Sequence, residues 1–508
     1  MYTQVMTAGL VGLNAFPVTV ELEASRGMSS FDIVGLADAS VKESRDRIQS
    51  AMRYNKIKVP GSKILINLAP ADIKKSGSGF DLAIATAVLT IMGIIPEEQL
   101  EGSAFIGEVS LKGDIRETKG ILPMAIDLYK RGIKRLFVPF VNAKEASCVK
   151  GLKVYGIERL ADLILFLNGR KAIAPTDRYE PKPDSYFGPL DYCDVKGQHI
   201  AKTALEIAAA GGHNALMIGT PGSGKSMLAK RLPTILPRMT FEESIEATNI
   251  HSVAGEIDQD EPLIIRRPFR SPHHTVSTAG LAGGGTIPRP GEVSLAHGGV
   301  LFLDELPEFS RQVLEILRQP LEDKKVTISR ASGSITYPCS FMLIAAMNPC
   351  PCGYFGAPGN KCTCTPAKVR TYLSKISGPL LDRFDLHIEV DPVEYEQLAS
   401  DEKAEPSEFI RERVQRARDI QNERYKGTSI TCNANITPDL MNEICVMDQK
   451  AKDMLGKVFD KLGLSARAYD KILKVGRTLA DMDGREVMIS RDIGAAVQFR
   501  SLDRKYWS

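Results

Sequence analysis

The first candidate site is a glycine-rich segment that ends in a lysine and a serine. Its residues are Gly219, Thr220, Pro221, Gly222, Ser223, Gly224, Lys225 and Ser226. Glycines allow backbone N–H groups to turn toward phosphate oxygens, a lysine at this position reaches the β- and γ-phosphates, and the serine hydroxyl suits Mg²⁺. The spacing therefore predicts a site for ATP or GTP. An ordinary glycine-rich turn is the alternative.

Two acidic residues, Asp304 and Glu305, follow the apolar run Val300-Leu301-Phe302-Leu303. Nucleotide hydrolysis needs one carboxylate for the Mg²⁺ shell and another that orients or deprotonates the attacking water. A buried strand would present both side chains at the edge of an α/β sheet. We therefore assign Mg²⁺ to Ser226 and Asp304, and water activation to Glu305. A strand that ends in surface acids is the alternative.

Two further residues stand where a nucleotide could be sensed. Asn348 follows the apolar run 341–346, and its amide could contact the γ-phosphate or the water; a turn asparagine before proline is the alternative. Arg383 precedes another predicted strand at 386–390. If the chains form a ring, Arg383 could stabilise charge on a neighbour's γ-phosphate. A surface ion pair with Asp382 or Asp385 agrees equally well with the sequence.

Four cysteines form two close pairs around a glycine-rich loop. They are Cys350, Cys352, Cys362 and Cys364. Soft thiolate ligands in this arrangement could close a tetrahedral Zn²⁺ site and fix a loop that lacks other support. The pattern predicts structural zinc, with free thiols as the alternative.

Basic residues occur in two segments that could line the central pore of a ring. They are Arg270, Arg289, Lys324, Lys325 and Arg330. Residues 324–337 alternate polar and apolar side chains around a glycine, which predicts a β-hairpin, and residues 267–292 form a glycine-rich insertion. We expect these cations to meet DNA phosphates, with solvated loop charges as the alternative. His273 and His274 receive no role.

These residues require an α/β scaffold. We expect an α/β domain over residues 1–168, a proline-rich linker over 169–189, a nucleotide-binding core over 190–391, and a helical lid or C-terminal domain over 392–508. The length permits several domains, each with its own core.

Composition narrows the cellular context. The chain has 508 residues, is 43% hydrophobic and carries a formal charge of +3. Its most apolar segment, residues 82–96, is too short to span a bilayer and predicts a buried helix. The N-terminus lacks a basic region before its first apolar stretch, so a signal peptide is not expected. Reduced cysteines and the absence of a membrane segment favour the cytoplasm.

Together, the motifs resemble those of AAA+ ATPases of the magnesium-chelatase-like branch, and in particular the ComM/YifB family. Further matching segments are Asp194-Val195-Lys196-Gly197-Gln198, the residues 267–274, the residues 288–292 and the residues 348–353. The resemblance covers nearly the whole chain. It implies an AAA+ core with a helical lid, ATP and Mg²⁺ as cofactors, a homohexameric ring, Arg383 as the arginine finger, and Arg467 as the lid arginine that senses the γ-phosphate.

The N-terminal domain resembles the ribosomal-S5-like fold of Lon-type protease domains. A Ser-Lys protease needs a serine and a lysine at two positions of this fold. By alignment those positions hold Gly79 or Phe80 and Leu122, so we expect no proteolysis. Nearby residues, Ser76, Ser78 and Lys119, would supply a dyad only in a shifted register.

The favoured function is an ATP-driven DNA motor, a helicase or translocase. The family resemblance implies branch migration of recombination intermediates during natural transformation, with single-stranded or branched DNA and possible recombination or competence proteins as partners. Two alternatives remain at this point. One is a chelatase motor that inserts Mg²⁺ into a porphyrin, and the other is a Lon-like protein remodeller or protease.

Overall fold

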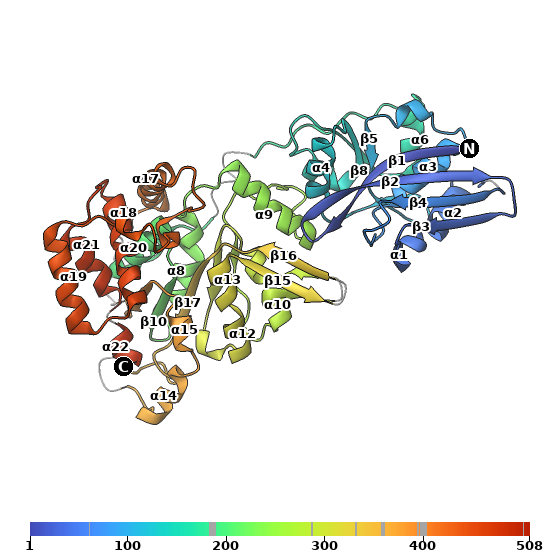
Figure 1. Cartoon of the computed structure of the whole chain (residues 1–508). Coiled ribbons are helices and arrows are strands. Elements are labelled where there is room, and N and C mark those ends of the chain that lie inside the picture. The colour runs from blue at the N-terminus through green and yellow to red at the C-terminus, as the bar shows by residue number, and fades with distance from the viewer. Residues whose placement is uncertain are drawn as a thin grey trace. The chain divides into compact units, whose positions relative to one another are not determined.

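The computed structural model describes residues 1–59, 61–181, 189–285, 288–330, 333–356, 361–393, 396, 404–500 and 502–507. The chain divides into two compact units, Met1–Lys182 with Ser244–Ile264, and Pro183–Glu243 with Ile265–Ser508 (Figure 1). This division differs from the boundaries expected from the sequence. The segment Ser244–Ile264, expected in the nucleotide-binding core, belongs to the first unit, while the C-terminal helices belong to the same unit as the core. Part of the expected linker, residues 182–188, lies outside the described residues.

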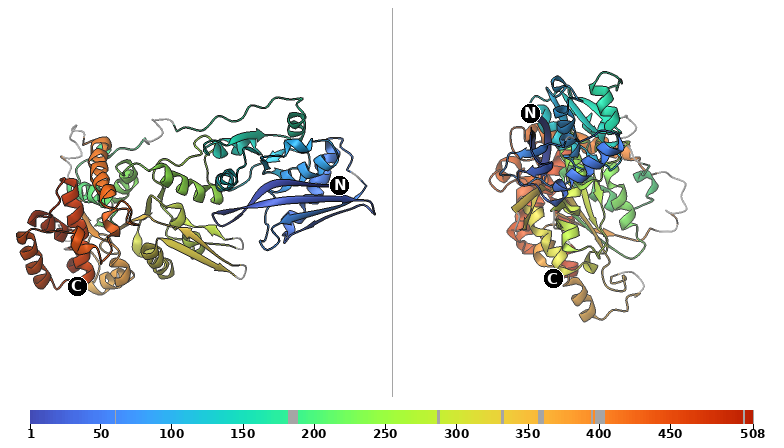
Figure 2. Two further views of the ribbon diagram at one scale, coloured as in Figure 1. Left: turned by 45° about the horizontal axis from the view of Figure 1, so that its top comes forward. Right: turned by 90° about the vertical axis from the view of Figure 1, so that its right-hand side faces the viewer.

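The first unit is built on a seven-stranded sheet in the order β3-β4-β2-β1-β5-β8-β9. The longest pair is the antiparallel ribbon of β1 and β2, which Figure 2 shows from two further directions. The strands are β1 (Tyr2–Val11), β2 (Asn14–Ser25), β3 (Ser30–Val34), β4 (Lys63–Ala69), β5 (Ser103–Phe105), β8 (Arg135–Pro139) and β9 (Lys153–Ile157). A short hairpin of β6 (Glu108–Val109) and β7 (Ile115–Arg116) lies outside this sheet.

Helices cover both faces of this sheet because its strands carry apolar side chains on both sides. On β8, Phe137 joins one buried cluster, while Leu136 and Val138 join the other. Alternate strand residues point to opposite faces, so the two clusters lie on opposite sides. The first cluster includes α2 (Ser44–Tyr54), α3 (Asp81–Ile91) and α6 (Leu160–Leu167), and the second includes α4 (Ile121–Lys130) and α5 (Ala143–Ala146).

Helix α3 confirms the buried helix predicted near residues 82–96. Every residue from Leu82 to Leu89 is buried, and the helix ends before Gly93, which has a φ of 71°. Glycine tolerates this left-handed conformation, which terminates helices. Among the described residues, no helix is long and apolar enough to cross a membrane.

The second unit contains a parallel five-stranded sheet in the order β11-β14-β17-β10-β18. Its strands are β10 (Ala215–Gly219), β11 (Phe269–Arg270), β14 (Val300–Leu303), β17 (Met342–Met347) and β18 (Leu386–Val390). All residues of β10, β14 and β17 are buried, as expected for parallel strands covered on both faces. Helices α7 (His199–Gly211) and α8 (Lys225–Arg231) flank β10 in the chain. The predicted α/β class, with a phosphate-loop core and C-terminal helices, is confirmed.

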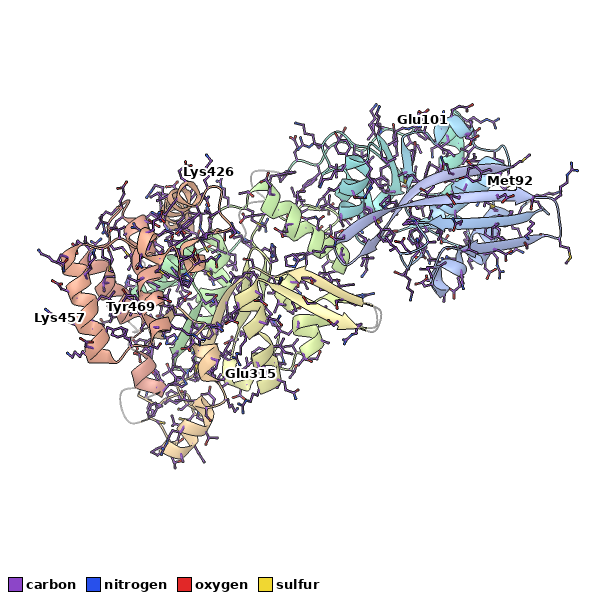
Figure 3. The ribbon with its side chains drawn as sticks, in the orientation of Figure 1. Met92, Glu101, Glu315, Lys426, Lys457 and Tyr469 are labelled. Atoms are coloured by element: carbon purple, nitrogen blue, oxygen red, sulfur yellow. The ribbon has the colours of Figure 1, made fainter. Side chains whose placement is uncertain are left out.

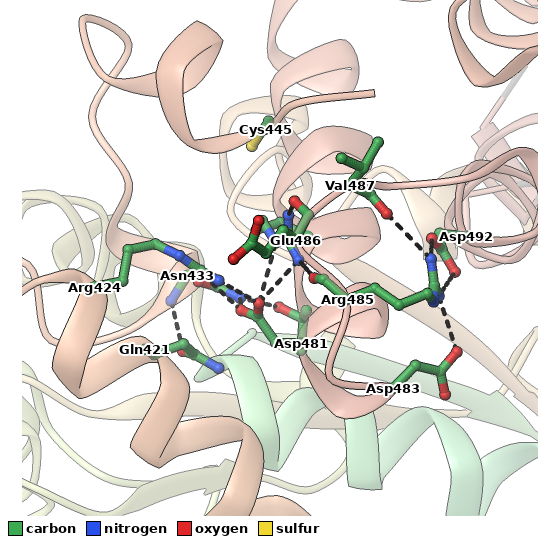
Figure 4. A network of polar contacts seen from close by, with 12 residues as sticks. Gln421, Arg424, Asn433, Cys445, Asp481, Asp483, Arg485, Glu486, Val487 and Asp492 are labelled. Atoms are coloured by element: carbon green, nitrogen blue, oxygen red, sulfur yellow. Dashed lines mark hydrogen bonds and ion pairs between the residues drawn. The ribbon is translucent and has the colours of Figure 1, made fainter. Parts of the chain in front are cut away.

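The C-terminal helices pack around a buried acid. Asp481, 1% exposed, lies near the end of α20 (Ala466–Met482), and its carboxylate accepts hydrogen bonds from Arg424, Asn433 and Arg477 (Figure 4). Arg424 ends α17 (Ser407–Arg424), so the network ties two helices together. Removing one partner of a buried ion pair strongly destabilises a protein, because the other charge stays buried without a partner. The network therefore holds α20, which carries Arg467 in its first turn, in place.

An aromatic contact joins α20 to α19 (Gln449–Leu462). Tyr469, labelled in Figure 3, meets Phe459 edge to face, with ring centroids 6.0 Å apart. This geometry is favourable for aromatic pairs. The following helix, α21 (Ser490–Gln498), packs on both α19 and α20.

Candidate functional site

The glycine-rich segment forms a turn between β10 and α8. Gly222 and Gly224 have φ values of 78° and 92°, a region that favours glycine. A Cβ atom on Gly219 would lie 2.2 Å from the carbonyl oxygen of Val390 on the neighbouring strand β18. The turn thus needs glycines at these positions, and it leads directly into a helix N-terminus. Helix N-termini are favourable sites for phosphate groups.

Lys225 is the first residue of α8, and its side chain reaches back to this turn. Its Nζ atom donates to the carbonyl oxygens of Gly219 (2.8 Å) and Thr220 (2.9 Å), and to Oδ1 of Asn348 (3.2 Å). Burial lowers the pKa of Lys225 to about 8, against the opposing effect of the Asp304 charge. The structure therefore brings Asn348, just after β17, to the lysine that is expected to bind phosphate.

The acidic pair follows β14 on the other side of β17. Ser226 Oγ donates to Asp304 Oδ2 at 2.6 Å, so the two expected Mg²⁺ ligands are in direct contact. Glu305 comes next, with a φ of 52° and a side chain that is 58% exposed. The carboxyl ends of β10, β17 and β14 thus gather Lys225, Asn348 and the acidic pair at one edge of the sheet, where open α/β sheets bind ligands.

His274 also lies at this site, although no role was expected for it from the sequence. Its Nδ1 atom is 3.7 Å from Oε2 of Glu305, and its ring contacts that of His273 in a tilted arrangement with centroids 4.0 Å apart. The residue follows β11, which pairs with β14 in the sheet. The positions of His274 and Glu305 in the sequence do not indicate that they lie close together. They do so because β11 and β14 are neighbouring strands, which places the residues after these strands side by side.

Arg383 and Arg467 occupy a separate patch of the second unit. Arg383 forms an ion pair with Glu322, just before the hairpin, rather than with Asp382 or Asp385 as the alternative expected. Arg467 Nη1 bonds to Asp382 Oδ2 at 3.1 Å. Burial, together with the nearby charges of Arg467 and Arg318, lowers the pKa of Arg383. None of the hydrogen bonds or ion pairs between described residues joins either arginine to Lys225, Ser226 or Asp304.

The four cysteines converge, as a metal site requires. Their sulfur atoms all lie within 4.8 Å of one another, and Cys350 Sγ is 3.3 Å from Cys352 Sγ and 3.7 Å from Cys362 Sγ. Tetrahedral zinc with Zn–S bonds near 2.3 Å separates its sulfurs by about 3.8 Å. A backbone hydrogen bond at Tyr354 lowers the pKa of Cys352 to about 6, which favours the thiolate. Part of the intervening loop, residues 357–360, lies outside the described residues.

The predicted hairpin is present as β15 (Lys325–Arg330) and β16 (Gly333–Pro338). The expected turn residues Ala331 and Ser332 lie outside the described residues. A second small hairpin pairs β12 (Gly283–Gly284) with β13 (Arg289–Pro290), and Tyr337 Oη donates to the Pro288 carbonyl oxygen between the two hairpins at 2.9 Å.

Four of the five basic candidates lie on or beside these two hairpins. The side chains of Arg289, Lys325 and Arg330 are exposed, and that of Lys324 is half-buried. Arg270 is different. It forms a two-pronged ion pair with Glu292, with N···O distances of 2.6 and 2.9 Å, so its charge is already matched within the chain.

Ser78 and Lys119, one of the residue pairs of a shifted protease register, are bonded to other residues in the first unit. Ser78 Oγ donates to Glu108, and Lys119 Nζ donates to the carbonyl oxygen of Ala254 at 3.1 Å. Ala254 ends α9 (Phe241–Ala254), and its neighbour Ser252 donates to the buried Glu145 beside Leu122. The end of α9 therefore covers the segment that would carry a catalytic lysine.

Three family models match the chain. Residues 191–398 match "Magnesium chelatase, subunit ChlI", residues 20–142 match "Subunit ChlI of Mg-chelatase", and residues 404–500 match "Magnesium chelatase, subunit ChlI C-terminal".

Curated relatives extend over almost the full chain. It is 42% identical over 499 residues to Competence protein ComM of Haemophilus influenzae, which covers 97% of this chain and 96% of that protein. It is 40% identical over 505 residues to the protein YifB of Escherichia coli, which covers 98% and 97% respectively. A shorter alignment, 30% identical over 154 residues, relates 28% of the chain to 27% of Lon protease 2 of Bacillus subtilis.

Proposed function

This chain belongs to the ComM/YifB family of magnesium-chelatase-like AAA+ ATPases, and from this premise we propose that it is an ATP-driven DNA motor working as a homohexameric ring. The observation that carries the DNA assignment is the pair of packed hairpins. They hold the exposed cations Arg289, Lys325 and Arg330 on neighbouring strands of one unit. Exposed cations on a ring's inner surface suit a nucleic-acid backbone.

Hydrolysis follows from the residues around Lys225. Lys225 binds phosphate oxygens, and Ser226 with Asp304 holds Mg²⁺, which neutralises phosphate charge when bound. Glu305 accepts a proton from water as the water oxygen bonds to the γ-phosphorus. The bond from this phosphorus to the bridging oxygen breaks, and ADP and phosphate leave. Asn348 accepts a hydrogen bond from Lys225 at 3.2 Å, which suits a sensor of the bound phosphates.

The site is completed by the next chain in the ring. Among the described residues, no hydrogen bond or ion pair joins Arg383 or Arg467 to the phosphate loop of their own chain, whereas the two arginines lie close enough for the charge of Arg467 to lower the pKa of Arg383. A second chain can present these two arginines to the γ-phosphate, where positive charge stabilises the transition state. Arg383 must first exchange its partner Glu322 for phosphate.

The biological role proposed is branch migration of recombination intermediates during natural transformation. Its support is the 42% identity to a protein named Competence protein ComM. Single-stranded or branched DNA would be the substrate, and recombination or competence proteins would be partners. We also propose that Cys350, Cys352, Cys362 and Cys364 bind structural Zn²⁺, because their sulfurs approach the spacing of a tetrahedral site.

A chelatase activity is the second candidate, because three family models carry the chelatase name. One experiment separates the candidates: ATPase rates measured side by side with single-stranded DNA, branched DNA, a porphyrin and unfolded casein. We expect stimulation by DNA alone. Stimulation by porphyrin would favour the chelatase, and stimulation by casein would favour a protein remodeller.

A further inference from the structure

The cysteine cluster is in direct contact with the phosphate-binding turn. Gly353 follows Cys352, has a φ of 86°, and donates its N–H to the carbonyl oxygen of Cys350 at 2.9 Å. A Cβ atom at Gly353 would lie 2.5 Å from both Cδ and Cγ of Pro221. Atoms this close cannot coexist without movement. The turn that carries the first two cysteines therefore packs tightly against the second unit's phosphate loop.

The cluster is also attached to Asn348 from two directions. Cys350 lies two residues after Asn348 and is fully buried, so its position constrains the end of β17. The second cysteine pair precedes α14 (Pro366–Leu373), whose Tyr372 is hydrogen-bonded to the backbone of Asn348. Both pairs of cysteines are thus linked through short segments to Asn348, which accepts a hydrogen bond from Lys225 at 3.2 Å.

We propose that zinc bound by the four cysteines sets the affinity of the site for ATP. The metal holds the Cys350–Gly353 turn against Pro221 and keeps Asn348 beside Lys225. When the metal leaves, the turn loses the metal–sulfur bonds that fix it. The phosphate loop is then no longer ordered before ATP binds. Part of the binding free energy must order the loop, so the affinity for ATP falls. This inference rests on the proposed zinc site.

The test uses the full chain and two measurements, zinc content and the affinity for a fluorescent ATP analogue with Mg²⁺. We expect zinc at a 1:1 ratio to the chain. Removing the metal with a thiol-competitive chelator should weaken nucleotide binding about tenfold or more, and adding Zn²⁺ back should restore it. Far-ultraviolet circular dichroism checks that the metal-free chain remains folded.

A glycine variant tests the contact without removing the metal. Gly353→Ala should keep its zinc and still bind ATP about tenfold more weakly, because the added methyl displaces Pro221. The matched control is Gly427→Ala. Gly427 has a similar φ of 82°, but its Cβ would meet nothing within 4 Å, so it shares the backbone strain without the clash.

The outcomes separate the inference from the zinc site itself. A zinc-containing protein whose nucleotide affinity is unchanged by metal removal would overturn the inference and leave the zinc site standing. Equal affinities for Gly353→Ala and Gly427→Ala would also overturn it. A protein purified without chelator that contains no zinc would refute both proposals.

Discussion

Replacing Glu305 with glutamine isolates the proton-accepting step. The substitution keeps the length of the side chain and its left-handed backbone, but removes the base. Loss of a general base lowers the rate by roughly 10²–10⁴, equivalent to about 3 to 5 kcal/mol of transition-state stabilisation. The side chain is 58% exposed, so the effect on folding should stay within about 0.5 kcal/mol.

Nucleotide affinity should be unchanged in Glu305→Gln, because phosphate binding is assigned to Lys225, and Mg²⁺ binding to Ser226 and Asp304. Single-turnover hydrolysis and equilibrium binding of a fluorescent ATP analogue measure the two effects separately. The matched control is Glu308→Gln, which changes a nearby glutamate that pairs with Lys375. This variant should hydrolyse ATP at the normal rate. Hydrolysis by Glu305→Gln at more than about a tenth of the wild-type rate would refute the assignment of Glu305 as the base.

His274→Leu should lower kcat about tenfold with unchanged nucleotide affinity, since Glu305 loses a neighbour that orients it, whereas His273→Leu should not. Asp481→Ala should lower the free energy of unfolding of the second unit by about 3 to 5 kcal/mol, measured by urea unfolding followed through Trp507 fluorescence. The control Asp483→Ala, at a half-exposed position, should lower it by less than about 1 kcal/mol. Chains carrying Arg383→Ala or Lys225→Ala should each be inactive. An equal mixture should recover about a quarter of the ATPase activity, because about a quarter of the interfaces in mixed rings then join an intact Lys225 to an intact Arg383. No recovery would argue against a shared site.

The sequence predicted the features that local patterns encode. Glycines followed by Lys225, an apolar run ending in Asp304, and alternating residues after Lys325 each specify a turn or strand within a few residues. The four cysteines could likewise be recognised from their spacing. These patterns work because backbone conformation and side-chain chemistry are set within one segment.

Other features depend on packing between distant segments. The contact of His274 with Glu305 follows from the pairing of β11 with β14, and that of Gly353 with Pro221 joins residues far apart in the chain. Arg383 pairs with Glu322, whereas the ion pair considered as an alternative from the sequence was with Asp382 or Asp385. Ser252 on α9 bonds to Glu145, which places part of the expected core segment in the first unit. No local pattern specifies such partners.

Coupling of ATP hydrolysis to DNA is tested by the steady-state ATPase rate of this chain, measured with and without branched or single-stranded DNA. We predict several-fold stimulation by DNA, which falls as salt rises because phosphate contacts dominate. The double variant Lys325→Glu with Arg330→Glu should lose most of this stimulation. A rate that DNA leaves unchanged, while casein or porphyrin increases it, would contradict the account.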